Sequence, residues 1–215
     1  DLAVAFDGDA DRCLAVDETG AVVDGDQMIA IFAAQMKGKG ALRGDTAVVT
    51  VMSNFGFMNF ARENGIRVKT TKVGDRYVLE AMLAGGYNIG GEQSGHIIFT
   101  DHMTTGDGQL SAVQLMGVMA ETGQPLSRLA GIITILPQVL VNLPATVDMK
   151  AGLAESLEIT AAVRECEEEL GDAGRVLIRP SGTEPLIRVM VEGPDLAQID
   201  GIARRIADAI QKNLA

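Results

Sequence analysis

The first 135 residues alternate between short apolar runs and longer segments in which apolar positions recur every three or four residues. The runs are typical of buried strands, and the recurring pattern is typical of helices that bury one face. Strands that alternate with helices of roughly 10–15 residues predict a layered α/β domain with a mixed, largely parallel sheet. Asp26 is the expected N-cap of the first helix. We expect strands at 2–6, 13–16, 21–23, 47–52, 66–70, 87–90 and 96–99, and helices at 26–36, 56–64, 75–83 and 107–122.

The pattern changes over residues 132–137, and a smaller unit follows. Its last segment, 195–212, has one apolar stripe that includes Ile199 and Ile206, as a surface helix does. This arrangement predicts a small α+β C-terminal domain. A further helix is expected at 156–170, and strands are expected at 139–143, 175–178 and 186–191.

Composition and charge narrow the function classes. The chain has 18 Lys and Arg against 29 Asp and Glu, and its net charge of −11 is unfavourable for binding a nucleic-acid backbone. No apolar run reaches the roughly 18–20 residues of a membrane span. The two cysteines, Cys13 and Cys166, are far apart in the sequence, which excludes a disulfide scaffold. We therefore expect a soluble cytoplasmic protein without nucleic-acid or membrane partners.

Three carboxylates at alternate positions make Asp7-Gly-Asp-Ala-Asp-Arg12, the acidic loop, the strongest local signal. Because small residues separate them, the carboxylates can converge, and hard cations such as Mg²⁺ prefer oxygen ligands. A plain acidic turn is one alternative. Another is a haloacid-dehalogenase-type phosphatase, in which Asp7 would be the nucleophile. An EF-hand is excluded because Arg12 stands where that loop needs glycine and because strands flank the segment.

The segment Gly90-Gly-Glu-Gln-Ser-Gly-His96, the glycine-rich loop, lies between two short predicted strands. Its glycines allow a ligand to approach the backbone, and Glu92, Ser94 and His96 offer an acceptor, a hydroxyl and an imidazole. Mixed donors and acceptors of this kind suit sugar hydroxyls. The alternative is a structural role for His96 in a turn.

Cations mark two further segments of this acidic chain. The arginine loop, Arg179-Pro-Ser-Gly-Thr-Glu-Pro185, and the following Arg188 combine hydroxyls, backbone N–H groups and two guanidinium groups suited to phosphate. The alternative is a proline-bordered turn with ordinary surface arginines. Thr71-Lys-Val-Gly-Asp-Arg76 stands where a predicted strand meets a helix, a position that suits a phosphate or a sugar.

Taken in order, these four segments resemble those of the α-D-phosphohexomutase superfamily, and the resemblance extends along the whole chain. The likeness is greatest to its glucosamine-specific branch, the bacterial phosphoglucosamine mutases, because Gln93 stands where other branches often carry Met. The resemblance implies a four-domain enzyme with its active site in a central cleft. On that template, residues 1–19 would be the end of the second domain, 20–135 the third domain and 136–215 the fourth.

The resemblance also implies a reaction and a role for each segment. A phosphoryl group would move between O6 and O1 of glucosamine phosphate, through a phosphoserine and a 1,6-bisphosphate. Mg²⁺ would be held by Asp7, Asp9 and Asp11. Arg12 would support the transferring charge, and His96 would move a proton. The substrate-binding residues would be Lys72, Gly74, Asp75, Arg76, Glu92, Ser94, Arg179, Ser181, Gly182, Thr183 and Arg188.

One departure from the family is large. The family's phosphoserine lies in a Ser-His-Asn sequence, and none of this chain's serines precedes His-Asn. We therefore expect the C-terminal part of a longer enzyme, inactive alone, whose partners are a phosphosugar and the missing N-terminal domains of the same polypeptide.

Several further expectations follow from the resemblance. Glucosamine 1,6-bisphosphate or glucose 1,6-bisphosphate would be the activator, and a homodimer stays open. The product would serve UDP-N-acetylglucosamine and peptidoglycan synthesis in the bacterial cytoplasm. The alternatives are a phosphomannomutase or phosphoglucomutase, a Mg²⁺-dependent phosphatase acting through Asp7, and a non-catalytic phosphosugar-binding module.

Overall fold

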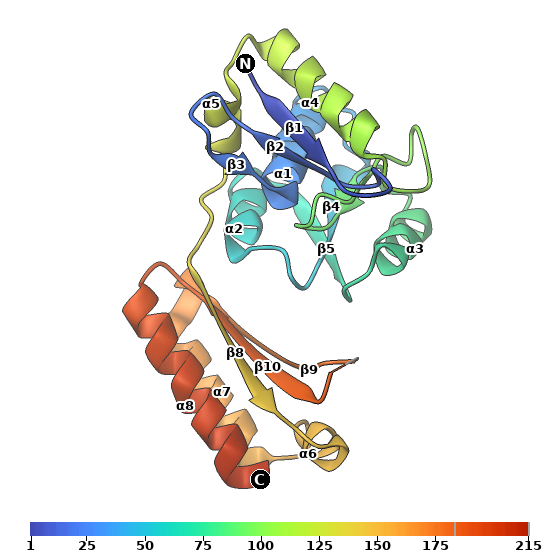
Figure 1. Ribbon diagram of the computed structural model, residues 1–215. Coiled ribbons are helices and arrows are strands. Elements are labelled where there is room, and N and C mark those ends of the chain that lie inside the picture. Colours follow the sequence, from blue (N-terminus) through green and yellow to red (C-terminus); the bar gives the residue numbers. More distant parts are fainter. Residues whose placement is uncertain (183, 215) are drawn as a thin grey trace. The chain divides into compact units, whose positions relative to one another are not determined.

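The computed structural model describes residues 1–182 and 184–214, and the chain divides into two units. Unit 1 is Asp1–Ile135 and unit 2 is Leu136–Ala215 (Figure 1). Residues 1–19 lie within unit 1, and their assignment to the end of a preceding domain stays a prediction.

The main sheet of unit 1 has the strand order β5-β4-β6-β7. β4 runs parallel to both of its neighbours, β5 and β6, whereas β7 is antiparallel to β6. This confirms the mixed, largely parallel sheet predicted from the sequence. A second sheet, β1-β2-β3, is antiparallel. The strands are β1 (Ala3–Phe6), β2 (Cys13–Val16), β3 (Val22–Val23), β4 (Thr46–Thr50), β5 (Arg67–Thr71), β6 (Gly90–Gly91) and β7 (Ile97–Ile98).

Nearly all residues in the first half of α1 are themselves buried, which makes α1 the central helix of unit 1. Met28 and Ile29 are fully buried, and the helix packs against α2, α4 and α5. Phe32 meets Phe99 edge-on, with 5.0 Å between the ring centroids. Burial on all sides indicates a core helix rather than a surface helix. The helices are α1 (Gly25–Gly38), α2 (Phe55–Glu63), α3 (Asp75–Gly85), α4 (Gly108–Thr122) and α5 (Leu126–Ala130), with the 3₁₀ turn η1 (Arg43–Asp45).

The prediction that Asp26 caps α1 was wrong. Asp24 is the cap, because its carboxylate accepts the N–H of Gln27 at 3.0 Å while the Gln27 side chain accepts the N–H of Asp24 at 3.1 Å. Asp26 is instead fully buried in the first turn, where it accepts the N–H of Asn54 at 2.7 Å. Two aspartates compete for the cap, and only Asp24 has a glutamine three residues later to complete a capping box.

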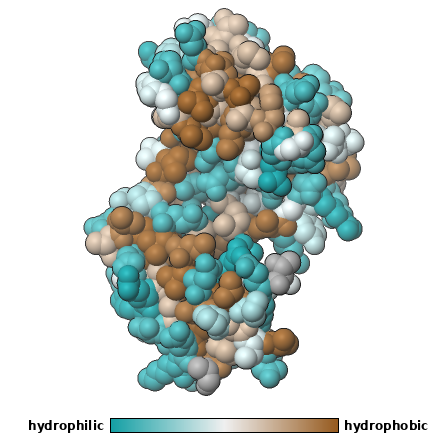
Figure 2. Space-filling model, viewed as in Figure 1, coloured by the Kyte–Doolittle hydropathy of each residue, from teal (hydrophilic) through white to brown (hydrophobic). Residues whose placement is uncertain are grey.

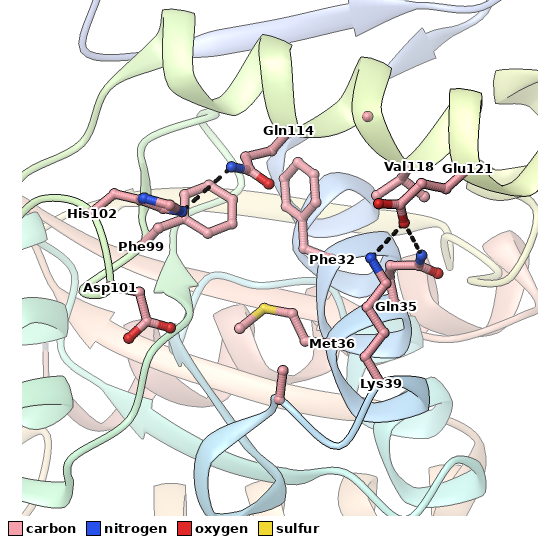
Figure 3. A pocket seen from close by; sticks show the side chains of 12 residues that line it. Phe32, Gln35, Met36, Lys39, Phe99, Asp101, His102, Gln114, Val118 and Glu121 are labelled. Carbon is pink, nitrogen blue, oxygen red and sulfur yellow. Dashed lines mark hydrogen bonds and ion pairs between the residues drawn. The ribbon is translucent and has the colours of Figure 1, made fainter.

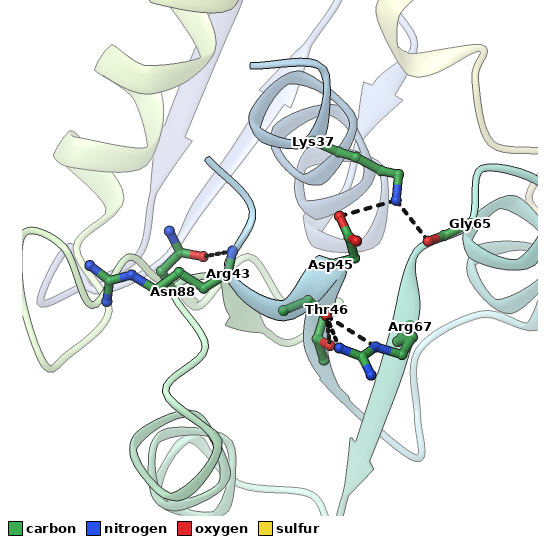
Figure 4. A network of polar contacts seen from close by, with 8 residues as sticks. Lys37, Arg43, Asp45, Thr46, Gly65, Arg67 and Asn88 are labelled. Atoms are coloured by element: carbon green, nitrogen blue, oxygen red, sulfur yellow. Dashed lines mark hydrogen bonds and ion pairs between the residues drawn. The ribbon is translucent and has the colours of Figure 1, made fainter. Parts of the chain in front are cut away.

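A polar network occupies the edge of the main sheet at which β4 and β5 begin (Figure 4). Lys37 donates to the carbonyl oxygen of Gly65 at 2.8 Å and pairs with Asp45 at 3.1 Å. The buried Asn88 accepts the N–H of Arg43 at 3.0 Å. Since parallel strands end at a common edge, the opposite edge of the sheet carries the loops of the candidate site.

Unit 2 is an antiparallel sheet of strand order β8-β10-β9, with α7 and α8 on one face (Figure 1). Ile187, Val189 and Val191 on one face of β10 are fully buried in a core that includes Ile199 and Ile206 of α8. This is the small α+β domain that the sequence predicts. The sequence pattern does not predict α5 or α6, because each is too short to show a period. The elements are β8 (Gln138–Pro144), α6 (Val147–Gly152), α7 (Leu157–Leu170), η2 (Gly171–Ala173), β9 (Arg175–Pro180), β10 (Leu186–Glu192) and α8 (Leu196–Leu214).

The surface mixes hydrophobic and hydrophilic residues on the face shown in Figure 2. Large apolar side chains that are exposed in unit 1 include Phe6 of β1, and Val113 and Met116 of α4. Across the described parts of the chain, we find no helix with both the length and the apolar character that crossing a membrane requires.

Candidate functional site

The acidic loop connects β1 with β2 and gathers its three carboxylates. One ligand oxygen from each of Asp7, Asp9 and Asp11 lies within 4.8 Å of the other two. Burial, together with the charges of Asp7 and Asp9, raises the pKa of the Asp11 carboxyl. Arg12 Nε lies 3.7 Å from Asp7 and 3.9 Å from Asp11, which offsets part of the repulsion. Three converging carboxylates fit a hard divalent cation such as Mg²⁺.

The start of α4 packs directly against the acidic loop. Ala10 has a left-handed φ of 60°, which is unfavourable for a residue with a side chain. Its carbonyl oxygen accepts the N–H of Gly108 at 2.9 Å. A Cβ at Gly108 would lie 2.5 Å from the carbonyl oxygen of Arg12, so only glycine fits there without displacing the loop.

The glycine-rich loop pairs directly with the acidic loop. The N–H of Cys13 donates to the carbonyl oxygen of Gly95 at 3.1 Å, and Arg12 and His96 form an antiparallel bridge. The imidazole Nε2 of His96 lies 3.5 Å from Asp11 Oδ2. Two loops far apart in the sequence are therefore joined directly by backbone hydrogen bonds.

The His96 ring is confined beside Asp11. Its side chain is 4% exposed, and no described residue is a hydrogen-bond partner of Nδ1. A Cβ at Gly106 would lie 2.3 Å from Nε2, so a side chain there would displace the ring. Sequence reasoning missed Gly106 and Gly108, because nothing in their local pattern separates them from ordinary turn glycines. Proton transfer by His96 stays a prediction.

The glycine-rich loop also reaches the starts of two helices. Glu92 Oε1 accepts the N–H of Gly74 at 3.0 Å, and Gly74 is the N-cap of α3 with a φ of 128°. Gln93 donates its Nε2 to Asp24, the cap of α1, at 3.2 Å. The structure thus brings the segment 71–76 to the glycine-rich loop, while Ser94 is exposed to solvent.

The remaining predicted residues of the segment 71–76 are on the surface. Lys72, Asp75 and Arg76 are all exposed. Arg76 pairs with Glu80 at 2.8 Å along α3, and this contact raises the pKa of the guanidinium. Among the described residues, Lys72 has no ion-pair partner, whereas Arg76 is already paired with Glu80. A ligand at the start of α3 would therefore compete with Glu80 for Arg76 but not for Lys72.

The arginine loop connects β9 with β10 in unit 2. Arg179 and Arg188 are direct neighbours across these antiparallel strands. Like charges directly opposite are unfavourable, so the pair favours an anion nearby. Arg188 pairs with Glu184 of the loop, and the N–H of Ser181 donates to the carbonyl oxygen of Leu186 at 2.8 Å. Thr183, which we also predicted to bind substrate, lies outside the described residues.

Sequence reasoning missed Lys150 of α6. Its Nζ donates to the carbonyl oxygens of Ser181 at 2.7 Å and Glu184 at 2.5 Å. The residue stands far from the arginine loop in the sequence, on a helix too short to be predicted, so no local signal connects the two.

A cavity of about 230 Å³ in unit 1 is lined by none of the predicted site residues (Figure 3). Phe32 and Phe99 form part of its apolar wall. At its rim Lys39 pairs with Glu121 at 2.5 Å, and Gln35 donates to the same carboxylate at 2.8 Å. These three polar groups therefore bond to one another at the rim of the cavity.

Comparison with known proteins gives two matching family models. The model of phosphoglucomutase/phosphomannomutase alpha/beta/alpha domain III matches residues 24–134. The model of the phosphoglucomutase/phosphomannomutase C-terminal domain matches residues 140–209. Together these matches cover most of both units.

Curated relatives and solved structures agree with these matches. The phosphoglucosamine mutase of Caldanaerobacter subterraneus subsp. tengcongensis is 56% identical over 100% of this chain and 48% of its own length. That of Frankia alni is 59% identical over 98% of this chain and 45% of its own length. The chain thus spans about half the length of the curated relatives it matches.

Among solved structures, Aspergillus fumigatus N-acetylphosphoglucosamine mutase in complex with GlcNAc-6P and magnesium has a TM-score of 0.82. It is 22% identical, over 100% of this chain and 49% of that chain. This likeness shows a shared fold. With domain III matched in unit 1 and the C-terminal domain in unit 2, the chain belongs to the phosphoglucomutase/phosphomannomutase family.

Proposed function

We propose that this chain carries the metal, sugar and phosphate loops of a phosphoglucosamine mutase, an isomerase that interconverts glucosamine 6-phosphate and glucosamine 1-phosphate. Curated relatives of that name, 52–59% identical, support the proposal. The observation that carries it is the pairing of the acidic loop with the glycine-rich loop. Carboxylates suited to a cation lie there beside groups suited to sugar hydroxyls.

The acidic loop would bind the metal. Asp7, Asp9 and Asp11 would hold Mg²⁺, which would neutralise charge on the transferring phosphoryl group. Arg12, 3.7 Å from Asp7, keeps a positive charge at the same place. His96, which contacts Asp11, is our candidate for moving a proton at the reacting hydroxyl.

The glycine-rich loop would bind the sugar. Glu92 accepts the Gly74 N–H through Oε1, which leaves its other oxygen for a hydroxyl. Ser94 is exposed and offers a second hydroxyl partner, and Lys72 is exposed on the neighbouring segment. Asp75 would bind there as well. Bonds to O3 and O4 would serve the sugar in both orientations, because these two groups are related by its pseudo-symmetry.

The arginine loop would bind the phosphate that is not being transferred. An anion between Arg179 and Arg188 would relieve the repulsion of two guanidinium groups opposite each other. Phosphate would compete with Glu184 for Arg188. Ser181, Gly182 and Thr183 would add hydroxyl and N–H donors. Fixing this phosphate would position the far end of the sugar.

The phosphate donor would come from elsewhere. The chain contains no Ser-His-Asn, in which the family's phosphoserine lies. We propose that the phosphoserine belongs to the half of the relatives that this chain does not span, and that this chain alone is inactive. A 1,6-bisphosphate of glucosamine or glucose would be the intermediate and activator. The bacterial cytoplasm stays the expected location.

The test is ³¹P NMR with glucosamine 6-phosphate, Mg²⁺ and a trace of the 1,6-bisphosphate. We expect no 1-phosphate from the chain alone. We expect conversion by a chimera in which the N-terminal half of the Caldanaerobacter relative precedes this chain. The matched variants are Asp9→Asn, which should stop conversion, and Asp208→Asn at an exposed position of α8, which should not.

Three outcomes would contradict the proposal. Turnover by the chain alone would mean that a nucleophile lies within it. Faster conversion of mannose or glucose phosphates by the chimera would favour the phosphomannomutase or phosphoglucomutase alternative. Release of inorganic phosphate that Asp7→Asn abolishes would favour the phosphatase.

A further inference from the structure

Lys150 donates hydrogen bonds to two backbone carbonyls of the arginine loop, those of Ser181 and Glu184. Its Nζ donates to Ser181 O at 2.7 Å and to Glu184 O at 2.5 Å. The segment that precedes α6 is tied to the same loop, because the N–H of Ala145 donates to the carbonyl oxygen of Pro185 at 2.8 Å. Among the described residues, the ammonium group and the Ala145–Pro185 bond therefore both anchor the loop to the region of α6.

The contact with Ser181 determines where the next N–H points. In a trans peptide the C=O and the following N–H point in opposite directions, and the chain has no cis peptide bond in its described residues. Because Ser181 O points at Lys150, the N–H of Gly182 points away from it. The position of a Cβ on Gly182 is open, with no atom within 4 Å, and no described residue accepts its N–H. This N–H is free to donate to an anion.

The charge of Lys150 also favours an anion. Within the described residues it pairs with no carboxylate, since its two bonds go to neutral carbonyls. It lines a hollow of about 370 Å³ together with Gly182 and Glu184. With Arg179 and Arg188, it makes three cations around a loop whose described part carries one carboxylate, Glu184.

We infer that Lys150 is a positioning residue, which holds the arginine loop in the shape that presents the Gly182 N–H to a phosphate oxygen. The inference rests on the proposed role of that loop in binding the phosphate of the sugar. It adds a residue from outside the loop, on α6, to the phosphate site.

The test measures binding of inorganic phosphate to the 215-residue chain by calorimetry, and the amide shift of Gly182 by NMR. Lys150→Met keeps the aliphatic stem but removes the donors. It should weaken phosphate binding by about tenfold and abolish the phosphate-induced shift of Gly182. Lys150→Arg keeps charge and donors and should bind within about threefold of wild type.

Lys37→Met is the matched control. Lys37 also donates to a backbone carbonyl, that of Gly65, but it lies in unit 1, at the sheet edge where β4 and β5 begin (Figure 4). It should bind phosphate like wild type, even where it lowers thermal stability. If Lys150→Met does not fold, Lys150→Gln takes its place in the same measurements.

The outcomes separate this inference from the proposed function. If wild type binds phosphate, Arg188→Ala loses it and Lys150→Met binds normally with an unchanged Gly182 shift, the inference is wrong and the phosphate role of the loop stands. If wild type binds no phosphate, both are wrong.

Discussion

The imidazole of His96 lies 3.5 Å from the carboxylate of Asp11, although one belongs to the glycine-rich loop and the other to the acidic loop. Two backbone interactions fix this side-chain contact: the β-bridge between Arg12 and His96, and the hydrogen bond from Cys13 N–H to Gly95 O. The two loops therefore cannot move independently. Any change that shifts one of them should alter ligand binding at the other.

Mg²⁺ should stabilise the chain through the acidic loop. A ligand that binds only the folded state at 100 times its Kd stabilises by about 2.7 kcal/mol, and we expect a rise of that order in the free energy of unfolding. Urea unfolding with and without Mg²⁺ measures it. Asp9→Asn should lose most of the effect, whereas the control Asp208→Asn should keep it. Equal stabilisation of both variants would mean that the ion binds elsewhere.

Gly108→Ala should destabilise unit 1 by about 1–3 kcal/mol, because a Cβ there would lie 2.5 Å from the carbonyl oxygen of Arg12. It should also weaken Mg²⁺ binding, since the displaced loop carries the carboxylates. Gly117→Ala, on the same helix with nothing within 4 Å, should instead stabilise by about 0.5–1 kcal/mol. Thermal unfolding and Mg²⁺ titration of both variants decide. Similar behaviour of the two would refute the role of the α4 start.

Burial raises the pKa of the Cys13 thiol to about 11. At pH 8 almost no thiolate forms, so iodoacetamide should label folded Cys13 more than about a hundredfold more slowly than the urea-unfolded chain. The measurement is mass spectrometry on Cys166→Ser, in which Cys13 is the only cysteine. Rapid labelling under native conditions would contradict the burial.

The same shift predicts a pH dependence of stability. The unfolded chain ionises Cys13 near the ordinary value of 9.0 and the folded chain only near 11, so unfolding releases a proton in this window. Stability from this group is complete below pH 9 and falls as the pH rises to about 11. Wild type should therefore lose stability more steeply than Cys13→Ala over that range. Parallel curves would count against the shift.

Glu192 is 1% exposed and pairs with Arg175 at 2.5 Å in the sheet of unit 2. Arg175→Met should destabilise unit 2 by about 3 kcal/mol, because it leaves a buried carboxylate without its cation. Arg164→Met removes a pair between exposed side chains, with Glu168, and should cost under about 0.5 kcal/mol. Chemical unfolding of unit 2 measures the free energy of unfolding of both variants. A loss below 1 kcal/mol for Arg175→Met would show that Glu192 is stabilised mainly by other contacts.

Local patterns in the sequence predicted the strands and the longer helices, but not the short helices α5 and α6. The run 186–191 predicts β10 and the pattern over 156–170 predicts α7, since alternation and helical periodicity depend only on neighbouring residues. The alternate carboxylates of the acidic loop indicate a cation site for the same reason.

Only the tertiary structure decided which segments meet. The contacts of His96 with Asp11, Glu92 with Gly74 and Lys150 with Ser181 each join residues far apart in the chain. Such contacts depend on strand order and on the close approach of glycine backbones, neither of which a local pattern encodes. The sequence by itself therefore determined which loops carry the candidate binding residues, and the fold determined which of these loops lie together.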